Sequence, residues 1–298
     1  MICARRAVTA FAGVVLSMLF SVDIEAADKA SASETLVVLK GLENVRTHFK
    51  PFTVRGTATR PVLGKDHKVE FRADCEAMKY RITSRPGLST VSVYDGTRLL
   101  LYDGNNSATI STPDHRTSTL AFDPRSLGLA TGLYSDLLLE TNLAYRAAED
   151  IVIAEIPVAR QQPGLVGIEL TDRFGQRIHF EIDDRAPYRL RYYSKTIPRT
   201  DGKGVFVKYV TESEYWADQP ESWIPRKLTM YTLEEGRADR RRVDMIVDLE
   251  RPESVAAFDP SIWTISGLSL PFGQPVADLR IRERIGYWNG KELVKDVP

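Results

Sequence analysis

The most regular pattern in the sequence is an alternation of apolar and polar positions after residue 151. Val166, Ile168 and Leu170 alternate with Gly167 and Glu169. The same period of two recurs in runs near residues 178–182, 190–192, 205–209, 224–230 and 243–249, separated by short polar connections. Such alternation is typical of strands that bury one face. It predicts a long antiparallel meander with one apolar face.

The first half of the chain carries a similar pattern. Alternating apolar positions run through Phe52 and Val54 and again from Val69 to Cys75. The alternation resumes one register out at Tyr80, which predicts a turn or bulge near Glu76 and Ala77. Together with the later runs this gives on the order of ten or eleven strands, enough that the sheet has to curl to hide its apolar face. Because no internal repeat or low-complexity linker divides the chain, a single domain is predicted.

The stretch from Val91 to Asp103, VSVYDGTRLLLYD, predicts a hairpin with a two-residue type I′ loop at Asp95-Gly96. That loop pairs Val91 with Leu100 and Ser92 with Leu99. One side of the hairpin then carries Val91, Val93, Leu100 and Tyr102, and the other carries Tyr94, Leu99 and Leu101. Since both sides are apolar, we expect a helix or an apolar ligand to cover the second one.

Two segments have the spacing of helices. Ser31 and Glu34 form a capping box, and leucines recur behind them at helical intervals, which predicts an amphipathic helix that ends before Pro51. Between Phe122 and Asp150 the two-residue period disappears and leucines accumulate. We expect one or two short helices there, as an insertion at about residues 123–146 that lies on an apolar surface.

The N-terminus has the plan of a secretory signal peptide. Arg5 and Arg6 precede an apolar run over residues 7–20, and small residues follow, with cleavage expected after Ala26. An uncleaved anchor is the alternative. The prediction is therefore a periplasmic or secreted protein, a single domain over residues 27–298. Cys75 is then the only cysteine, which excludes an intramolecular disulfide and favours a buried structural thiol.

Composition and motifs argue against several functions. The chain has 40 basic and 40 acidic residues, so its charge gives no reason to expect a nucleic acid or an anionic membrane surface as partner. The four histidines are far apart, and no metal, phosphate-loop, dinucleotide or nucleophile-elbow motif occurs. The arginines at 237 and 240–242 fit a polar strand start better than an anion site. No catalytic residue, metal or cofactor is predicted, and the protein is not expected to be an enzyme.

The signal peptide, the N-terminal helix, the hairpin, the leucine-rich insertion and the segment FDPSIWTISGLSLPFGQPVADLR together resemble the periplasmic lipoprotein-carrier family of LolA type. Asp95, Gly96 and Tyr102 stand where that family has an Asp-Gly turn followed by an aromatic residue. The family's C-terminal spacing is matched by Pro271, Gly273, Val276 and Asp278.

The resemblance implies a mainly β (α+β) fold. A strongly curved antiparallel sheet would form a half-open β-barrel, with an N-terminal helix and a helical lid, and acyl chains would bind between sheet and helices. Carriers of this family also depend on an arginine near the mouth, and Arg81 and Arg85 are the nearest basic residues here. The side chains expected to line the acyl groove are Val91, Val93, Leu100, Tyr102, Leu133, Leu137, Ile168, Phe180, Tyr192, Tyr209, Met230 and Met245.

Three hypotheses follow. The first is an exported, non-enzymatic protein that binds a lipid or lipoprotein acyl chain and carries it across the periplasm, with peripheral rather than integral membrane contact. The second is an envelope scaffold or a lipid-sensing regulator, such as the RseB type, with a protein partner. The third is an enzyme, which would need His, Asp or Glu side chains clustered in one cleft.

Overall fold

The structure is a computed structural model that describes residues 37–38, 40–42, 44, 49–77, 79–85, 90–105, 108–112, 152–156, 163–171, 175, 177–199, 205–234 and 241–296. In these residues the regular structure is mostly β. The first six strands are β1 (Phe52–Val62), β2 (Lys65–Glu76), β3 (Lys79–Arg85), β4 (Thr90–Tyr94), β5 (Leu99–Tyr102) and β6 (Ala108–Ser111). The next seven are β7 (Val152–Ile156), β8 (Leu165–Thr171), β9 (Arg177–Asp183), β10 (Leu190–Pro198), β11 (Val205–Glu214), β12 (Lys227–Glu234) and β13 (Arg241–Leu249). The C-terminal segment adds β14 (Glu253–Ser254), two 3-10 helices, η2 (Pro260–Trp263) and η3 (Ile265–Leu268), and β15 (Pro275–Asp278), β16 (Glu283–Trp288) and β17 (Leu293–Val294).

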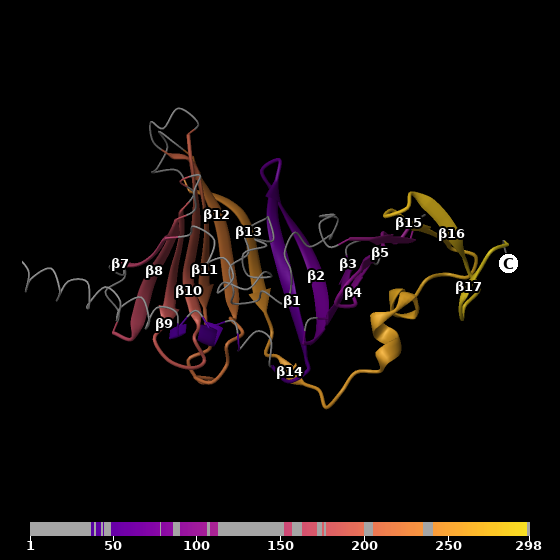
Figure 1. Ribbon diagram of the computed structural model, residues 1–298, viewed down its shortest axis with the longest axis horizontal. Helices are drawn as coiled ribbons and strands as arrows, with labels where there is room; N and C mark the ends of the chain where they lie inside the picture. Colours follow the sequence, from indigo (N-terminus) through magenta and orange to yellow (C-terminus); the bar gives the residue numbers. More distant parts are fainter. Residues whose placement is uncertain are drawn as a thin grey trace, which may run out of the picture.

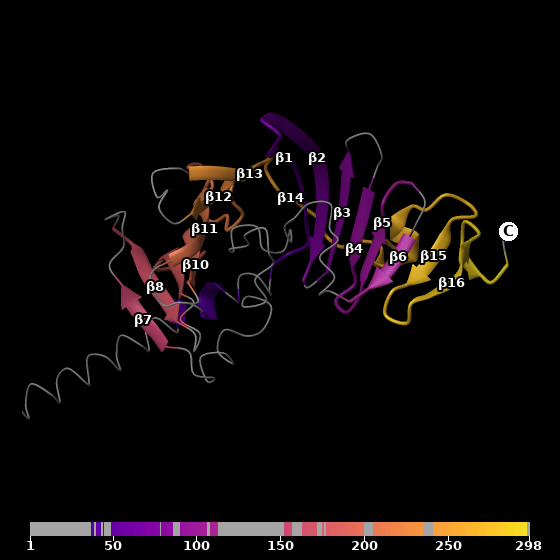
Figure 2. The ribbon, with the colours of Figure 1, turned by 90° about the horizontal axis from the view of Figure 1, so that it is seen from above.

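All of these strands belong to one large curved and unclosed sheet (Figures 1 and 2). The later meander, β7 to β13, joins the earlier one, β1 to β6, because β13 pairs antiparallel with β1. Figure 2 shows the strands following an arch, with β13, β1 and β2 in its middle. Neighbouring strands run antiparallel except β15, which adds to β6 in parallel. In the described residues the sheet has 17 strands, so the prediction of ten or eleven was too low; four of the strands, β14 to β17, lie in the C-terminal segment.

Pairing defines two faces of this sheet, since residues directly opposite each other point to the same side. We call the face that carries Phe180, Met230, Met245, Phe71 and Tyr80 the inner face, and the opposite one the outer face. The predicted alternation in β1, β2 and β3 is confirmed. Ala77, with φ of 48°, makes the turn expected between β2 and β3, where Glu76 pairs with Lys79.

The β4–β5 hairpin is confirmed, but its predicted register is wrong. Val91 pairs with Tyr102, and the backbone N–H of Asp95 donates to the carbonyl of Arg98, so Gly96 and Thr97 form the turn. The Asp95 carboxylate stabilises this arrangement by accepting from the backbone N–H groups of Thr97 and Arg98. Only Gly96 needs a positive φ, 101°, whereas a type I′ loop at Asp95-Gly96 would need two such residues. The pairing moves by two residues, so each side chain keeps its predicted face.

The outer side of this hairpin is covered by the chain's own C-terminal segment. Trp263 of η2 and Leu268 and Leu270 from η3 and its end form one buried cluster with the outer-face residues of β4, β5 and β6. The Trp263 indole N–H donates to Glu76 at 3.0 Å, and the Arg81 Nε donates to the carbonyl of Gly267 at 2.8 Å. The apolar second face that the sequence suggested is therefore part of the protein core.

The two expected helical elements are largely outside the described residues. Within residues 37–44 the described positions are helical, and Val38 and Leu42 pack against β8, β9 and β10. The ends of that helix, the signal peptide and the insertion at about 123–146 are not described, so these remain predictions. None of the helices in the described part of the chain has the length and apolarity to span a lipid bilayer.

Candidate functional site

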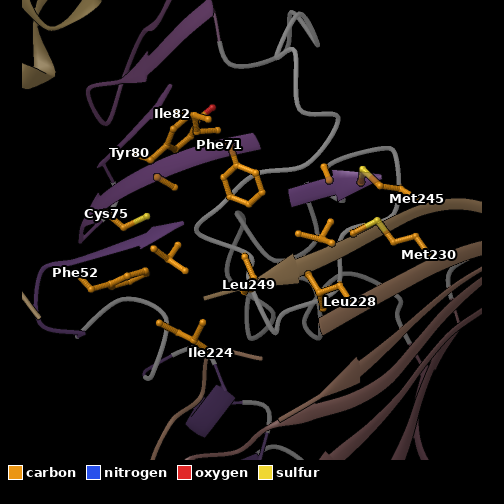
Figure 3. Packing of buried hydrophobic residues seen from close by; sticks show 14 of the residues in the cluster. Phe52, Phe71, Cys75, Tyr80, Ile82, Ile224, Leu228, Met230, Met245 and Leu249 are labelled. Carbon is orange, nitrogen blue, oxygen red and sulfur yellow. The ribbon is translucent and has the colours of Figure 1, made fainter. Parts of the chain in front are cut away.

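The inner face gathers apolar side chains from both halves of the chain. Figure 3 shows side chains from β1, β2 and β3 facing others from β12 and β13 in one cluster. The labelled members are Phe52, Phe71, Cys75, Tyr80, Ile82, Ile224, Leu228, Met230, Met245 and Leu249. Cys75 is fully buried in this cluster, as expected for a structural thiol. The pairing of β1 with β13 thus brings residues almost two hundred positions apart into one cluster.

The same face continues across the later meander, where Lys195 and Thr211 also point inward among the apolar side chains. Met230 pairs with Thr211, Thr211 with Tyr193 and Tyr193 with Phe180, so these side chains lie on one side. Phe180 pairs in turn with Ile168, and both are completely buried in a second cluster that includes β8, β9 and β10. Apolar side chains therefore line the inner face from β8 to β5 in two clusters, with polar side chains of β10 and β11 between them.

The two ends of the inner face differ in chemistry. At the start of β1, Phe49, Phe52 and Trp223 lie edge to face or tilted, with ring centroids 5.1 to 5.9 Å apart. Toward the tip of the β1–β2 hairpin the lining consists of Met230, Met245 and the side chain of Arg60. From Phe52 to Arg60 the strand covers about 27 Å at 3.4 Å per residue. This length exceeds the roughly 15 Å thickness of the hydrocarbon layer of one bilayer leaflet, in which an acyl chain lies.

Five of the side chains predicted to line an acyl groove share the inner face. Ile168 and Phe180 belong to the β8–β10 cluster, and Met230 and Met245 to the cluster of Figure 3. Tyr209 lies between them, because it pairs with Lys195 and Thr232, and it is half-buried. The structure brings these residues to one surface; whether they contact a ligand stays a prediction.

Four other predicted residues lie elsewhere. Val91, Val93, Leu100 and Tyr102 point to the outer face, where they are buried against η2 and η3. The prediction that they share a face is confirmed, but it is not the face of the other predicted residues, because the C-terminal segment had not been expected to cover them. Leu133 and Leu137 lie outside the described residues.

Tyr192 is also separated from the inner-face residues. The sequence pattern had placed it with Leu190, but the register of β10 shifts between Leu190 and Tyr192, so Tyr193 takes the inward position. Tyr192 points outward, 5.3 Å from the ring of His179, with the Lys208 ammonium 5.7 Å above its own ring. The expectation that Leu190 and Tyr192 share a face is wrong, since a bulge reverses the alternation.

The outer face of β9 carries a buried polar pair that the sequence did not single out. His179 Nε2 lies 3.8 Å from an oxygen of Glu181, whose side chain is 1% exposed. Burial, and then the charge of Lys208, lowers the pKa of His179 to about 4, so the imidazole is neutral at neutral pH. The contact is thus not an ion pair under those conditions. Within the described residues no group of three or more His, Cys, Asp or Glu side chains is placed to hold a metal ion.

Several arginines of the described sheet make structural contacts, and Arg60 differs from them. Arg81, suggested by the resemblance, points outward to the Gly267 carbonyl and lies 3.6 Å from Asp74. Arg241 and Arg242 pair with Glu212 and Asp244, as the interpretation of a polar strand start requires. Arg60, which sequence analysis missed, points to the inner face. Its position in the alternating pattern of β1 was the one available signal.

Comparison with known proteins gives the fold a precedent. No protein-family model matches the chain, and no curated protein matches it. Among solved structures, it is similar to a LolA superfamily protein from Nitrosomonas europaea, with a TM-score of 0.51 and 10% sequence identity, over 78% of this chain and 99% of that one. The chain has a LolA-like fold.

Two further solved structures match at lower TM-scores. One is a putative outer membrane lipoprotein-sorting protein domain from Vibrio parahaemolyticus, with a TM-score of 0.48 and 9% identity, over 78% of this chain and all of that one. The other is a DUF1329 family protein from Desulfovibrio piger, with a TM-score of 0.44 and 12% identity, over 80% of this chain and 98% of that one.

Proposed function

We propose that this protein binds a lipid or lipoprotein acyl chain on the inner face of its sheet. The observation that carries the proposal is the pair of apolar clusters on the inner face, one on β8–β10 and one that spans β12, β13, β1, β2 and β3, on the concave side of one unclosed sheet. A LolA-like fold is compatible with that use. Met230 and Met245 lie at its centre, and methionine side chains adapt to ligands of different shape because they are unbranched and polarisable.

The energetic reason for such a site is the cost of exposing hydrocarbon. Each CH₂ group that leaves an apolar environment for water costs about 0.8 kcal/mol, so a sixteen-carbon chain faces roughly 12 kcal/mol. A protein that encloses the chain removes most of this barrier. We propose that the protein thereby carries a lipid or lipoprotein between membranes, in the periplasm or outside the cell, as the expected signal peptide suggests.

Native mass spectrometry of the purified protein, before and after incubation with palmitate, tests the proposal. We expect lipid that co-purifies with the protein or a one-to-one complex after incubation. A protein that carries no lipid and takes up none under conditions where it remains folded would refute it. A pull-down from envelope extract tests the second hypothesis, a protein partner, and recovery of lipid without protein would count against that alternative.

A pair of matched variants locates the site. Val69 is half-buried on the inner face, and Thr57 is half-buried on the outer face of the adjacent strand, so asparagine can be introduced at either position. An unpaired amide against an acyl chain costs about 1–3 kcal/mol. Val69→Asn should therefore weaken palmitate binding about 5- to 100-fold, and Thr57→Asn should change it by less than about twofold. Equal effects would place the ligand elsewhere.

A further inference from the structure

Arg60 is a charged side chain on an apolar surface. It lies on the inner face of β1, one position beyond the Thr59–Ile246 pair, and its Nε donates to the sulfur of Met245 at 3.5 Å. Met245 is completely buried. A thioether is a weak acceptor, so this contact supplies little of what a guanidinium loses when it leaves water.

Part of the Arg60 guanidinium lacks an acceptor among the described residues. Its Nη2 is buried there without a hydrogen bond, and no ion pair joins Arg60 to a described carboxylate. The surrounding apolar side chains lower the pKa of Arg60 by burial alone, with no contribution from a neighbouring carboxylate. Other arginines of the sheet behave differently: Arg72, Arg191 and Arg242 each pair with an aspartate within 3.0 Å.

An unpaired buried donor lowers stability, because the group loses its water without gaining a partner. The five N–H groups of the Arg60 guanidinium form a planar fork that fits the two oxygens of a carboxylate or phosphate. The position of Arg60 is also suitable for binding a charged group, since Arg60 lies where the methionine-lined part of the inner face approaches the tip of the β1–β2 hairpin. His67, which pairs with Arg60 on β2, is exposed, so this end of the surface borders solvent.

We propose that Arg60 binds the anionic group of the acyl ligand, a carboxylate or a phosphate, while the hydrocarbon lies along Met230, Met245 and the aromatic end of the inner face. This inference rests on the proposed function and specifies its ligand class: an amphiphile with one acidic end rather than a neutral lipid. The guanidinium then sets both the orientation of the ligand and its selectivity.

Three ligands with the same hydrocarbon chain test the proposal: ionised palmitate, hexadecyl phosphate and neutral hexadecanol. Affinities are measured by displacement of a fluorescent apolar probe. Because hydrogen bonds to charged groups are stronger than neutral ones, we expect at least one anion to bind about 10- to 100-fold more tightly than hexadecanol. Comparison of the two anions shows whether a carboxylate or a phosphate fits, and inorganic phosphate alone tests whether the chain is required.

Arg60→Gln should abolish the preference for anions and leave the affinity for hexadecanol unchanged. Arg60→Lys should retain part of the preference, because it keeps the charge but not the fork. Lys195→Gln is the matched control: it removes another inner-face cation, four strands away on β10, and should preserve the preference. The stability of Arg60→Gln should equal or exceed that of the wild type, which separates a binding role from a structural one.

The outcomes distinguish this inference from the proposed function. If hexadecanol binds and the anions bind no more tightly, or if Arg60→Gln weakens all three ligands equally, Arg60 is not an anion site although the protein still binds acyl chains. If Lys195→Gln alone removes the preference, the charged end lies at β10. If none of the three ligands binds, the proposed function fails and this inference with it.

Discussion

Leu268→Ala tests whether the C-terminal segment completes the core of the β4–β5 hairpin. Leu268 is 1% exposed and packs from η3 against outer-face residues that include Val91 and Val93. Replacing a fully buried leucine by alanine removes its transfer free energy and leaves a cavity, which together cost about 2–5 kcal/mol. We expect a loss of about 3 kcal/mol in the free energy of unfolding. For a domain of this size that lowers the melting temperature by about 6–12 °C.

Urea denaturation followed by tryptophan fluorescence measures this loss, with Leu279→Ala as the control. Leu279 belongs to the same segment but is 38% exposed, so its truncation should cost less than about 1 kcal/mol. A loss below about 1 kcal/mol for Leu268→Ala would refute the reasoning, because η3 would then not seal the hairpin. Palmitate affinity should not change in the folded variant. A marked fall in palmitate affinity would indicate that the ligand contacts the outer-face residues, Val91, Val93, Leu100 and Tyr102.

Three other predictions concern single positions. The pKa of His179 is about 4 in the folded protein and 6.5 in the unfolded chain, so its contribution to stability is present above pH 6.5 and is lost as the pH falls toward 4. In urea titrations, His179→Asn should reduce the loss of unfolding free energy over this pH range by about 2 kcal/mol, after allowance for partial exposure. Gly267→Ala should destabilise by more than 2 kcal/mol in the same assay, because its Cβ would lie 1.9 Å from the Ile262 carbonyl oxygen; a neutral effect would contradict the close packing of η2 and η3. Leu63 is fully exposed and has a left-handed φ of 50°, which asparagine tolerates better than leucine. Leu63→Asn should therefore raise the free energy of unfolding by about 0.5–1 kcal/mol, with a slightly higher melting temperature. A loss of stability would show that the leucine makes a favourable contact.

The sequence alone determined the β character, the curved sheet with an apolar face and the β4–β5 hairpin, and its resemblance to the LolA-type family implied the LolA-like fold. The β character and the faces follow from local information: the two-residue period assigns each side chain to a face, and the break in that period at Glu76-Ala77 marks the turn between β2 and β3. A shift of two residues in the β4–β5 register left every face assignment intact for the same reason.

The tertiary structure decided which apolar faces belong to one surface. No local signal shows that residues 260–270 cover the outer side of β4 and β5, so Val91 and Phe180 looked equivalent although they lie on opposite faces. A single bulge in β10 turned Tyr192 outward, and the alternating pattern did not reveal it because Tyr192 and Tyr193 are both aromatic and either could take the inward position. Arg60 was indistinguishable from other strand arginines until the pairing of β1 with β13 placed it beside Met245. Periodicity sets the direction of a side chain, whereas its partners depend on contacts between segments far apart in the chain.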